Sequence, residues 1–386
     1  MKPRFLPGNR VDLLETGAEF FPALLAAIAA AQLEVRLDTY IFADDATGRQ
    51  VAAALAAAAG RGVRVHLLVD GFGARGFMHS LGGTLRTAGV EVLVFRPDVS
   101  PWTLRRHRLR RLHRKLACVD ARIAFVGGIN IIDDYDTPGQ TPPRYDYAVR
   151  IEGPLLAPIV DSMRHLWRLV RWTTLHRRPR RTPALPASCT QQGEVSAAFL
   201  VRDNLRHRRD IEHAYLRAIG TAKKEIILAN AYFLPGRRFR RALTLAARRG
   251  IGVTVLLQGR REYALLHYAS RALYASLLGA GVRIFEYRSS YLHAKVAVVD
   301  GHWATVGSSN IDPFSLLLAR EANVVVNDAA FAGRLRAGLQ HAMEHGAIEV
   351  AAGPWGRKPA WVRGIQWLAY GLVRVLIGLA GYGRQS

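Results

Sequence analysis

The sequence predicts an α/β fold of two similar α/β/α sandwich lobes, related by pseudo-twofold symmetry, with a functional site at their interface. Apolar, β-branched runs alternate with helical stretches, which is typical of α/β layers with a largely parallel sheet in each lobe. The order and spacing of these runs occur twice. A motif of one His, one Lys and one Asp also occurs once in each half. We therefore interpret the chain as a duplication.

The predicted strands and helices follow the same order in both halves. The strand-like runs of the first half are 34–42, 63–71, 90–95, 115–120, 123–128 and 145–153. Their counterparts in the second half are 225–233, 252–259, 281–287, 295–300, 303–310 and 321–328. Two pairs of helical stretches lie between them, 18–32 with 209–223 and 48–61 with 236–250. Both second helices end in Arg-Gly, as helix C-termini commonly do.

Four segments follow from this repeat. They are a first lobe over 1–176, a Pro- and Arg-rich linker over 177–194, a second lobe over 195–350 and a C-terminal tail over 351–386. The first lobe carries an insertion around 97–112, before its motif. This insertion is strongly basic and contains Trp102, Arg105, Arg106, Arg108, Arg110 and Arg111.

Two apolar helical segments are candidates for membrane contact. The tail from Trp361 to Tyr382 has cations only at Arg363 and Arg374, and it is short for a bilayer span. We interpret it as an amphipathic helix at the membrane interface, with a short span or a helix docked on the lobe as alternatives. Segment 155–176 carries a stripe of arginines among aromatic residues. It is either a core helix of the first lobe or a second membrane contact.

The composition indicates an anionic partner. Lys and Arg number 54 against 30 Asp and Glu, so the net charge is +24 and the isoelectric point is near 11. Such a surface attracts nucleic acid or the anionic face of a lipid bilayer. The two cysteines, Cys118 and Cys189, form no disulfide framework or zinc spacing, and we expect Cys118 in the core. The charged N-terminus indicates no signal peptide, so we expect the protein on the cytoplasmic side.

The repeated motif carries the candidate catalytic residues. These are His113, Lys115 and Asp120 in the first copy, and His293, Lys295 and Asp300 in the second. Because side chains alternate along a strand, the His and the Lys of each copy point to the same face. An ammonium group beside an imidazole repels a metal cation and attracts an anion. The motifs therefore predict a phosphate site without a metal ion.

Polar residues after each motif complete the predicted phosphate site. A Gly-Gly-x-Asn run ends at Asn130, and a Gly-Ser-x-Asn run contains Ser308 and ends at Asn310. We expect all three side chains to contact phosphate. Since imidazole titrates near pH ~6.5, one His can attack phosphorus while the other donates a proton.

A carboxylate in the last strand of each half is the candidate partner of each imidazole. A catalytic imidazole is oriented by an acceptor on its second nitrogen. Glu321 begins the strand at 321–328, and Asp146 has the equivalent position in the first half. We expect Asp146 to bind His113 and Glu321 to bind His293, so that each pair lies within one half.

A glycine-rich segment after the second strand resembles a dinucleotide-binding fingerprint. It reads Gly71-x-Gly73-x-x-Gly76. No clear amphipathic helix follows it, and the repeat partner near 258–262 has no glycine pattern. We interpret it as a loop at the rim of the site.

The paired motifs resemble the two HKD motifs of the phospholipase D superfamily, over roughly residues 8–350. Several phrases are similar to the short, B-type class of bacterial cardiolipin synthases: LHRK at 112–115, DYAVR at 146–150, NAYF at 230–233 and HWATVGSSN at 302–310. The resemblance implies phosphatidyl transfer between two phosphatidylglycerol molecules through a phosphohistidine, without a metal or other cofactor. It also implies that Asp120 and Asp300 lock each motif through structural hydrogen bonds.

The resemblance further implies an anionic phospholipid membrane as partner and phosphatidylglycerol as donor and acceptor. We expect a peripheral protein on the cytoplasmic face of the cell membrane, with His113 attacking and His293 protonating the departing glycerol. The alternative is a phospholipase D-type phosphodiesterase acting on other phospholipids or on nucleic acid. The net charge suits nucleic acid, but the apolar tail and the lack of a nucleic-acid module disfavour it. Phosphatidylethanolamine or water as acceptor, and the oligomeric state, stay open.

Overall fold

The computed structural model describes most of the chain. The described residues are 3–97, 110–139, 141–173, 185–203, 206–261, 264–312, 315, 319–351, 353 and 359–377. Part of the predicted basic insertion lies outside them, namely Trp102, Arg105, Arg106 and Arg108. Much of the predicted linker and the end of the tail with Tyr382 also lie outside the described residues.

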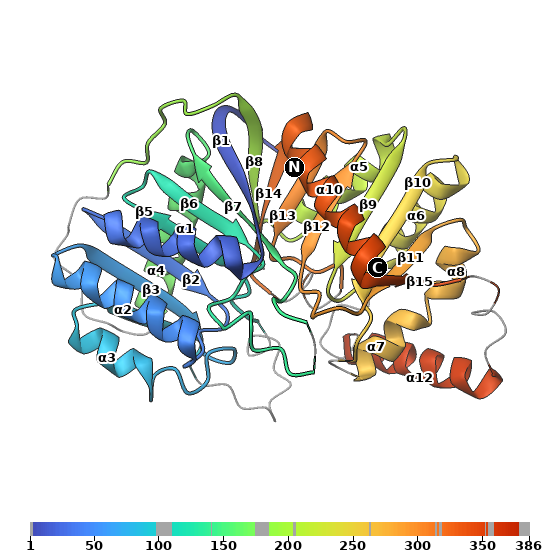
Figure 1. Cartoon of the computed structure of the whole chain (residues 1–386), viewed down its shortest axis with the longest axis horizontal. Helices are drawn as coiled ribbons and strands as arrows, with labels where there is room; N and C mark the ends of the chain where they lie inside the picture. Colours follow the sequence, from blue (N-terminus) through green and yellow to red (C-terminus); the bar gives the residue numbers. More distant parts are fainter. Residues whose placement is uncertain are drawn as a thin grey trace.

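One continuous sheet of 15 strands runs through both lobes of the described chain (Figure 1). The first lobe contributes β1 (Leu6–Glu15), β2 (Glu34–Thr39), β3 (Arg64–Asp70), β4 (Glu91–Phe95), β5 (Lys115–Val119), β6 (Ile123–Gly127) and β7 (Tyr147–Glu152). The second lobe contributes β8 (Val195–Arg202), β9 (Glu225–Asn230), β10 (Gly252–Gln258), β11 (Arg283–Tyr287), β12 (Lys295–Val299), β13 (Trp303–Gly307), β14 (Glu321–Asn327) and β15 (Ala347–Glu349).

The order of the strands shows the pseudo-twofold symmetry that the repeat predicts. Across the sheet the order is β15-β11-β10-β9-β12-β13-β14-β8-β1-β7-β6-β5-β2-β3-β4. Without β15, this order reads as the same seven-strand arrangement in opposite directions from the centre. The central strands β1 and β8 pair antiparallel and join the two halves into one sheet.

The expected largely parallel sheet in each lobe is wrong in two respects. The sheet is continuous, and the only parallel ladders of the described chain lie within β2–β3–β4 and within β9–β10–β11. The other ladders are antiparallel. A short turn explains the antiparallel pairs β5–β6 and β12–β13, because a connection of a few residues joins antiparallel neighbours only. Asp120 and Ala121 form one such turn at positive φ, and Asp300 and Gly301 form the other.

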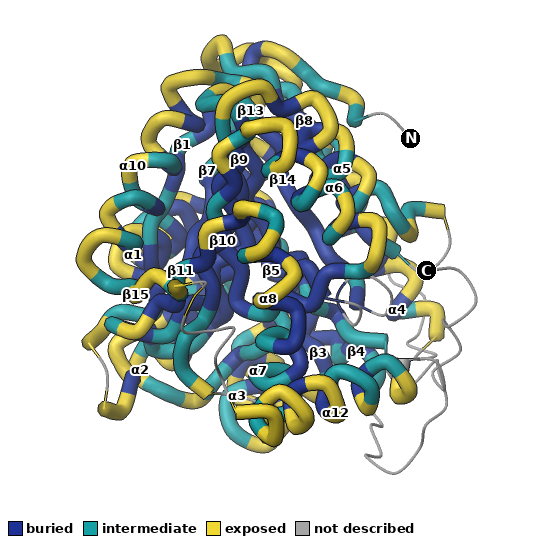
Figure 2. The backbone as a smooth tube through the Cα atoms, turned by 90° about the vertical axis from the view of Figure 1, so that its right-hand side faces the viewer, coloured by how far each residue is buried: buried dark blue, intermediate teal, exposed yellow. Residues whose placement is uncertain are grey.

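Helices cover both faces of the sheet and bury its strands (Figure 2). The first-lobe helices are α1 (Thr16–Ala30), α2 (Ala46–Gly60), α3 (Leu81–Thr87) and α4 (Leu156–Thr173). The second-lobe helices are α5 (Asp210–Thr221), α6 (Arg237–Arg248), α7 (Ala264–Arg271), α8 (Tyr274–Leu278), α10 (Ala329–Gly346) and α12 (Ala360–Ile377). α1 with α2, and α5 with α6, each cover an outer core. α4 and α10 share an inner core with strands of both lobes. The lobes therefore fold around a common centre.

The packing of the first lobe tests the predictions for segment 155–176, for Cys118 and for the glycine-rich segment. α4 buries its apolar stripe, including Ile159, Met163 and Leu166, so segment 155–176 contains a core helix. Cys118 is buried in the core, as predicted. The glycine-rich segment is a series of turns between β3 and α3, which agrees with a loop.

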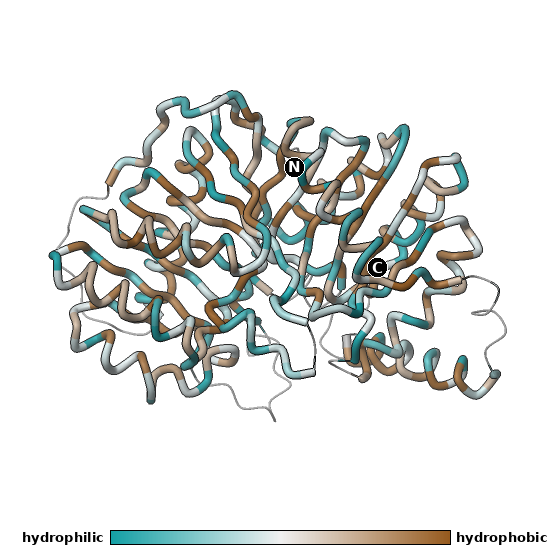
Figure 3. Tube along the Cα trace, viewed as in Figure 1, coloured by the Kyte–Doolittle hydropathy of each residue, from teal (hydrophilic) through white to brown (hydrophobic). Residues whose placement is uncertain are grey.

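The tail helix α12 docks on the second lobe along one face only. Ala369 and Val373 are buried in the outer core of that lobe, and α12 packs against α7. The opposite face leaves large apolar side chains exposed, and Figure 3 shows hydrophobic positions along the helix. Within the described part of the chain, no helix combines the length and hydropathy needed for a membrane span. The docking alternative is therefore correct for one face, and the other face needs a separate explanation.

Candidate active site

Main-chain bridges between the lobes hold the two motif histidines. The residue before His113 pairs with Arg320 as an isolated β-bridge, and the His113 N–H donates to the Arg320 carbonyl at 3.0 Å. The same arrangement recurs around His293, whose N–H donates to the Tyr145 carbonyl at 2.8 Å. Each histidine is therefore tied to the residue that precedes the candidate carboxylate of the opposite lobe.

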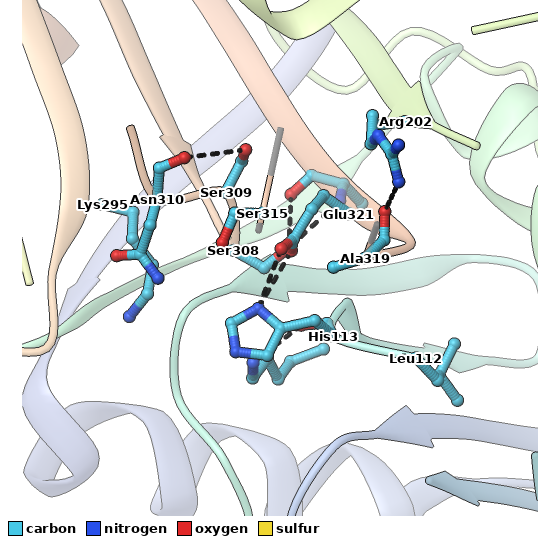
Figure 4. Close-up of polar contacts among 12 residues, drawn as sticks. Leu112, His113, Arg202, Lys295, Ser308, Ser309, Asn310, Ser315, Ala319 and Glu321 are labelled. Carbon is cyan, nitrogen blue, oxygen red and sulfur yellow. Dashed lines mark hydrogen bonds and ion pairs between the residues drawn. The ribbon is translucent and has the colours of Figure 1, made fainter. Parts of the chain in front are cut away.

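The imidazoles bind the carboxylates of the opposite lobes, so the expected pairing within each half is wrong. His113 Nδ1 lies 3.0 and 3.1 Å from the two Glu321 oxygens, as Figure 4 shows. His293 Nδ1 lies 2.6 Å from Asp146 Oδ2. The sheet explains the exchange, because β7 and β14 lie next to the central strands and begin at the lobe interface. All four residues were identified from sequence, but the partners are exchanged.

The site favours neutral imidazoles in the free protein. Burial is the main cause that lowers the pKa of His113, although Glu321 opposes it. Burial and then the neighbouring Lys295 lower the pKa of His293 to about 3. Burial would raise the pKa of Asp146, but Lys295 and His293 bring it below its ordinary value. With the Nδ1 proton donated to a carboxylate, each Nε2 lone pair is available to a substrate.

Both motif lysines lie buried beside their histidines, on the face that the strand period predicts. Lys115 Nζ donates to the His113 carbonyl at 2.7 Å, and burial lowers the pKa of Lys115 to about 7. Lys295 Nζ lies 2.8 Å from His293 Nδ1 and 3.7 Å from Asp146 Oδ2. Lys295 of the second motif contributes to lowering the pKa of Lys115, so the two motifs form one electrostatic site. Cations in such a buried site attract an anionic ligand strongly.

The two motif asparagines are fixed by the backbone in equivalent ways. Asn130 Oδ1 accepts from the Ile41 N–H at 3.1 Å, and Asn310 Oδ1 accepts from the Tyr232 N–H at 3.3 Å. Because each amide oxygen is engaged, the amide NH₂ is the end left for a ligand. This geometry supports the predicted phosphate contacts of both residues.

Ser308 supports a carboxylate, which differs from the expected phosphate contact. Its fully buried hydroxyl donates to Glu321 Oε2 at 2.5 Å and accepts from the Ala322 N–H at 3.1 Å. The first half has Gly128 at this position. A Cβ there would lie 2.3 Å from Asp146 Oδ1, so the carboxylate itself fills the space. The two carboxylates are therefore packed differently: Glu321 accepts a hydrogen bond from Ser308, whereas Asp146 lies directly against Gly128.

The motif aspartates make structural hydrogen bonds to the backbone, as the resemblance implies. Asp120 accepts from the backbone N–H groups of residues 32, 33 and 34 at 2.8–2.9 Å. Asp300 accepts from those of residues 223, 224 and 225 at 2.7–3.0 Å. Each carboxylate therefore fixes the start of the neighbouring strand, β2 or β9, against the turn that ends the motif strand.

Comparison with known proteins agrees with this arrangement. The family model "Cardiolipin synthase, PLD-like domain" matches residues 24–157 and 215–343, which include both motifs. The chain belongs to this family. It is 39% identical to cardiolipin synthase B of Salmonella typhi, over 99% of this chain and 92% of that protein. It is 40% identical to cardiolipin synthase B of Escherichia coli K12, over 88% of this chain and 81% of that protein.

A more distant relative and a solved structure extend this comparison. Cardiolipin synthase A of Pectobacterium carotovorum is 30% identical, over 94% of this chain and 75% of that protein. The crystal structure of phosphatidylserine synthase from Haemophilus influenzae superposes with a TM-score of 0.69 at 13% identity, covering 97% of this chain and 95% of that one. The latter supports the fold alone.

Sequence reasoning missed two residues at the site of this cardiolipin synthase family member. The Tyr40 ring packs edge-on against the His113 ring at 4.9 Å between centroids and lies 5.4 Å from Lys115 Nζ. Asp70 accepts from the Leu112 N–H at 2.7 Å, immediately before His113. Their positions could have indicated them. Tyr40 directly follows the parallel strand β2 and Asp70 ends the parallel strand β3, and ligands commonly bind at the carboxyl ends of such strands. In the described chain, no group of three or more His, Cys, Asp or Glu side chains could hold a metal ion.

Proposed function

We propose that this protein is a phosphatidyltransferase that converts two phosphatidylglycerol molecules to cardiolipin and glycerol. The observation that carries the proposal is the pair of exchanged His–carboxylate contacts, His113 with Glu321 and His293 with Asp146. In both contacts the Nδ1 of the imidazole faces a carboxylate of the other half, which supports a role for both rings at one lysine-containing site. The names of the relatives supply the lipid class, since the similar proteins are cardiolipin synthases.

The proposed reaction has two steps at the same phosphorus atom. In the first, the Nε2 of one imidazole attacks the donor phosphodiester, a P–N bond forms and the P–O bond to glycerol breaks. The other imidazole donates its proton to the departing glycerol oxygen. In the second, this imidazole takes a proton from the primary hydroxyl of the acceptor, whose oxygen replaces the histidine on phosphorus. The number of phosphodiesters is unchanged, so no energy-rich cofactor is required.

The substrate itself supplies the charge that the free site lacks. Both imidazoles have lowered pKa values in the free protein, so neither is a ready proton donor. An anionic phosphodiester bound between them raises the pKa of both, because it stabilises the charged form. The nucleophile can then stay neutral while the second imidazole gains a proton. Lys115, Lys295, Asn130 and Asn310 bind the phosphoryl oxygens during transfer.

We also propose that the exposed face of α12 lies against an anionic membrane, on the cytoplasmic side. Trp361, Ile365, Leu368 and Leu372 are 45–76% exposed and recur every three or four residues, so they form one stripe. We call this set the α12 stripe. An apolar stripe with an aromatic end on a protein of charge +24 suits the interface of an anionic bilayer.

The purified chain tests the proposed reaction directly. Incubation with vesicles of phosphatidylglycerol and phosphatidylcholine should give cardiolipin and glycerol in equal amounts, as measured by mass spectrometry. His113→Asn and His293→Asn should each abolish the product. Adding phosphatidylethanolamine reports whether a second acceptor competes. Phosphatidic acid as the sole product would instead support the phosphodiesterase alternative, with water as acceptor.

A further inference from the structure

The surroundings of the two histidines differ, although the fold relates them by symmetry. On the His113 side, the chain before the histidine carries Arg110 and Arg111, and the bridging residue is Arg320. At the corresponding positions on the His293 side stand Ser290, Tyr291 and Tyr145. At these three positions, arginines on the His113 side are therefore replaced by one serine and two tyrosines on the His293 side.

The space beside each histidine also differs, since it is filled by side chains on one side and open on the other. On the His293 side, Tyr145 stacks on Tyr287 at 5.3 Å between centroids and bonds to the Gly338 carbonyl, so this space is filled. On the other side, an open cavity of about 330 Å³ lies between α4 and the end of β8. Its lining includes four arginines and three carboxylates, namely Arg114, Arg202, Arg206 and Arg320 with Asp161, Asp203 and Glu321.

The cavity shares a wall with the catalytic centre. Glu321, which orients His113, also lines the cavity. In the view of Figure 4, Arg202 lies on one side of Glu321, while Lys295 and Asn310 lie on the other. An anion in this cavity would thus be a neighbour of the reacting phosphate and would occupy a different position.

Arg320 lines the cavity, and two further arginines, Arg96 and Arg110, lie close enough to it to lower its pKa. The guanidinium groups of Arg96 and Arg320 both lie over the Phe95 ring, at 5.5 and 6.0 Å from its centroid. Within the described residues, neither group has an ion pair, nor does Arg110, whose buried Nε has no hydrogen-bond partner. By contrast, Arg114 is held by Asp38 at 2.6 Å.

The carboxylates that act on Arg96 and Arg320 already accept backbone N–H groups. Asp70, near Arg96, accepts three backbone N–H groups. Asp203, near Arg320, accepts the N–H of His207. Burial and neighbouring arginines lower the pKa of Arg320 to about 10, which agrees with a crowded cationic cluster. Such a cluster is stabilised by a bound anion, and planar guanidinium groups match phosphate oxygens.

We propose that this arginine cavity binds the phosphate of the acceptor lipid. The inference rests on the proposed function. The reacting phosphate has Lys115 and Lys295 of its own, so Arg96, Arg110 and Arg320 are additional to the needs of one phosphodiester. A phosphatidylglycerol acceptor brings a second anion toward the first, and the arginines offset their repulsion. Glycerol or water as acceptor carries no second phosphate and gains nothing from the cavity.

The test compares two acceptors in one sample. The enzyme is incubated with phosphatidylglycerol–phosphatidylcholine vesicles and labelled glycerol, and both cardiolipin and labelled phosphatidylglycerol are measured. Arg320→Gln should lower the ratio of cardiolipin to glycerol exchange by about tenfold, because a charge-assisted contact to the acceptor alone is lost. The His113 contact uses the Arg320 backbone and is retained in this variant. A ratio equal to that of the parent enzyme would overturn the proposal.

Two controls make the comparison specific. Arg248→Gln removes the same charge from the exposed end of α6 and should leave the ratio unchanged. Any loss of folded protein cancels, since both products come from the same molecules. Inorganic phosphate should inhibit cardiolipin formation more than glycerol exchange, and Arg320→Gln should remove this selectivity. Equal inhibition of both reactions would count against a separate site.

Calorimetric titration with inorganic phosphate examines the cavity without turnover. The parent chain should bind phosphate at two positions, and Arg320→Gln at one. If the parent forms neither lipid product but still binds one phosphate more than Arg320→Gln, the proposed function is wrong and the proposed anion site in the cavity is supported. If the lipid products form but the variant binds phosphate as the parent does, the cavity proposal fails alone.

Discussion

At the scale of single residues, each motif imidazole has two contacts with the opposite lobe. One is the backbone N–H bond to residue 320 or 145, and the other is the Nδ1 contact with the carboxylate that follows. The first contact sets the position of the histidine backbone, and the second sets the ring orientation. An error in lobe docking would therefore misplace both the ring and its partner.

Loss of an orienting carboxylate should reduce turnover. Glu321→Gln and Asp146→Asn keep the shape of each side chain but no longer stabilise an imidazolium, so kcat should fall by about 100-fold or more. Glu349→Gln, at an exposed ion pair on the sheet edge, is the matched control and should retain full activity. Initial rates of cardiolipin formation measure the effect. Rates within about twofold of the parent for both variants would remove the assigned role.

The pH dependence of KM for phosphatidylglycerol should follow the titration of Lys115. Burial lowers its pKa to about 7, against the opposing influence of Glu321 and Asp146 and with the support of Lys295. A lysine is charged below its pKa, so phosphodiester binding should weaken as the pH rises through about 7. KM for phosphatidylglycerol should therefore rise between about pH 6 and 9, and Lys115→Arg should flatten this rise. A KM that is constant in the parent enzyme would contradict the assignment.

At the scale of elements, a motif aspartate connects a turn to the neighbouring strand. Asp300 stands at positive φ and accepts three backbone N–H groups at the start of β9. Partial burial would raise its pKa, but these N–H groups lower it. A lowered carboxyl pKa adds stability above the unfolded value of about 4, and this stability is lost on acidification.

Asp300→Asn should therefore destabilise the protein without disabling the chemistry. The free energy of unfolding at pH 7 should fall by about 1–2 kcal/mol, and the difference from the parent should shrink near pH 3. Denaturant unfolding at both pH values measures this change. Asp44→Asn, an exposed partner of Arg49, should have a smaller effect. An undiminished difference at pH 3 would argue against the linkage.

The α12 stripe should determine vesicle binding. Leu368→Asp with Leu372→Asp places two charges on the exposed face and leaves the docked face with Ala369 unchanged. Sedimentation with phosphatidylglycerol vesicles should show at least about tenfold weaker binding, because burial of two leucines is lost and anionic lipid is repelled. Leu245→Asp, at an exposed position on α6, should bind as the parent does. Unchanged binding of the α12 variant would place the membrane contact elsewhere.

At the scale of the whole molecule, the continuous sheet makes the two lobes one unit. β1 and β8 pair at the centre, and one inner core contains residues from both halves. If each lobe had its own separate site, contacts within that lobe would suffice to build it. Here each half supplies its histidine and lysine to a centre that the other half completes with a carboxylate. The duplication thus yields one site from two motifs.

Much of this organisation could be predicted from the sequence, because it depends on local periodicity. The strand and helix runs, the two motifs and the carboxylates at Asp146 and Glu321 all follow from spacing within one half. The exchange of partners could not be predicted, since spacing carries no information about how two lobes dock. The role of Ser308 was misjudged for a related reason. Its neighbour Glu321 is close in the fold, but lies 13 residues away in the chain.

The imidazole ¹⁵N spectrum of the labelled protein tests the exchanged pairing most directly. His113→Asn and His293→Asn identify the two ring signals by their absence. Glu321→Gln should shift the His113 signals and leave those of His293 in place, while Asp146→Asn should do the reverse. If Glu321→Gln shifted His293 and spared His113, each lobe would pair its own residues, and the account of a single site shared between the lobes would be wrong.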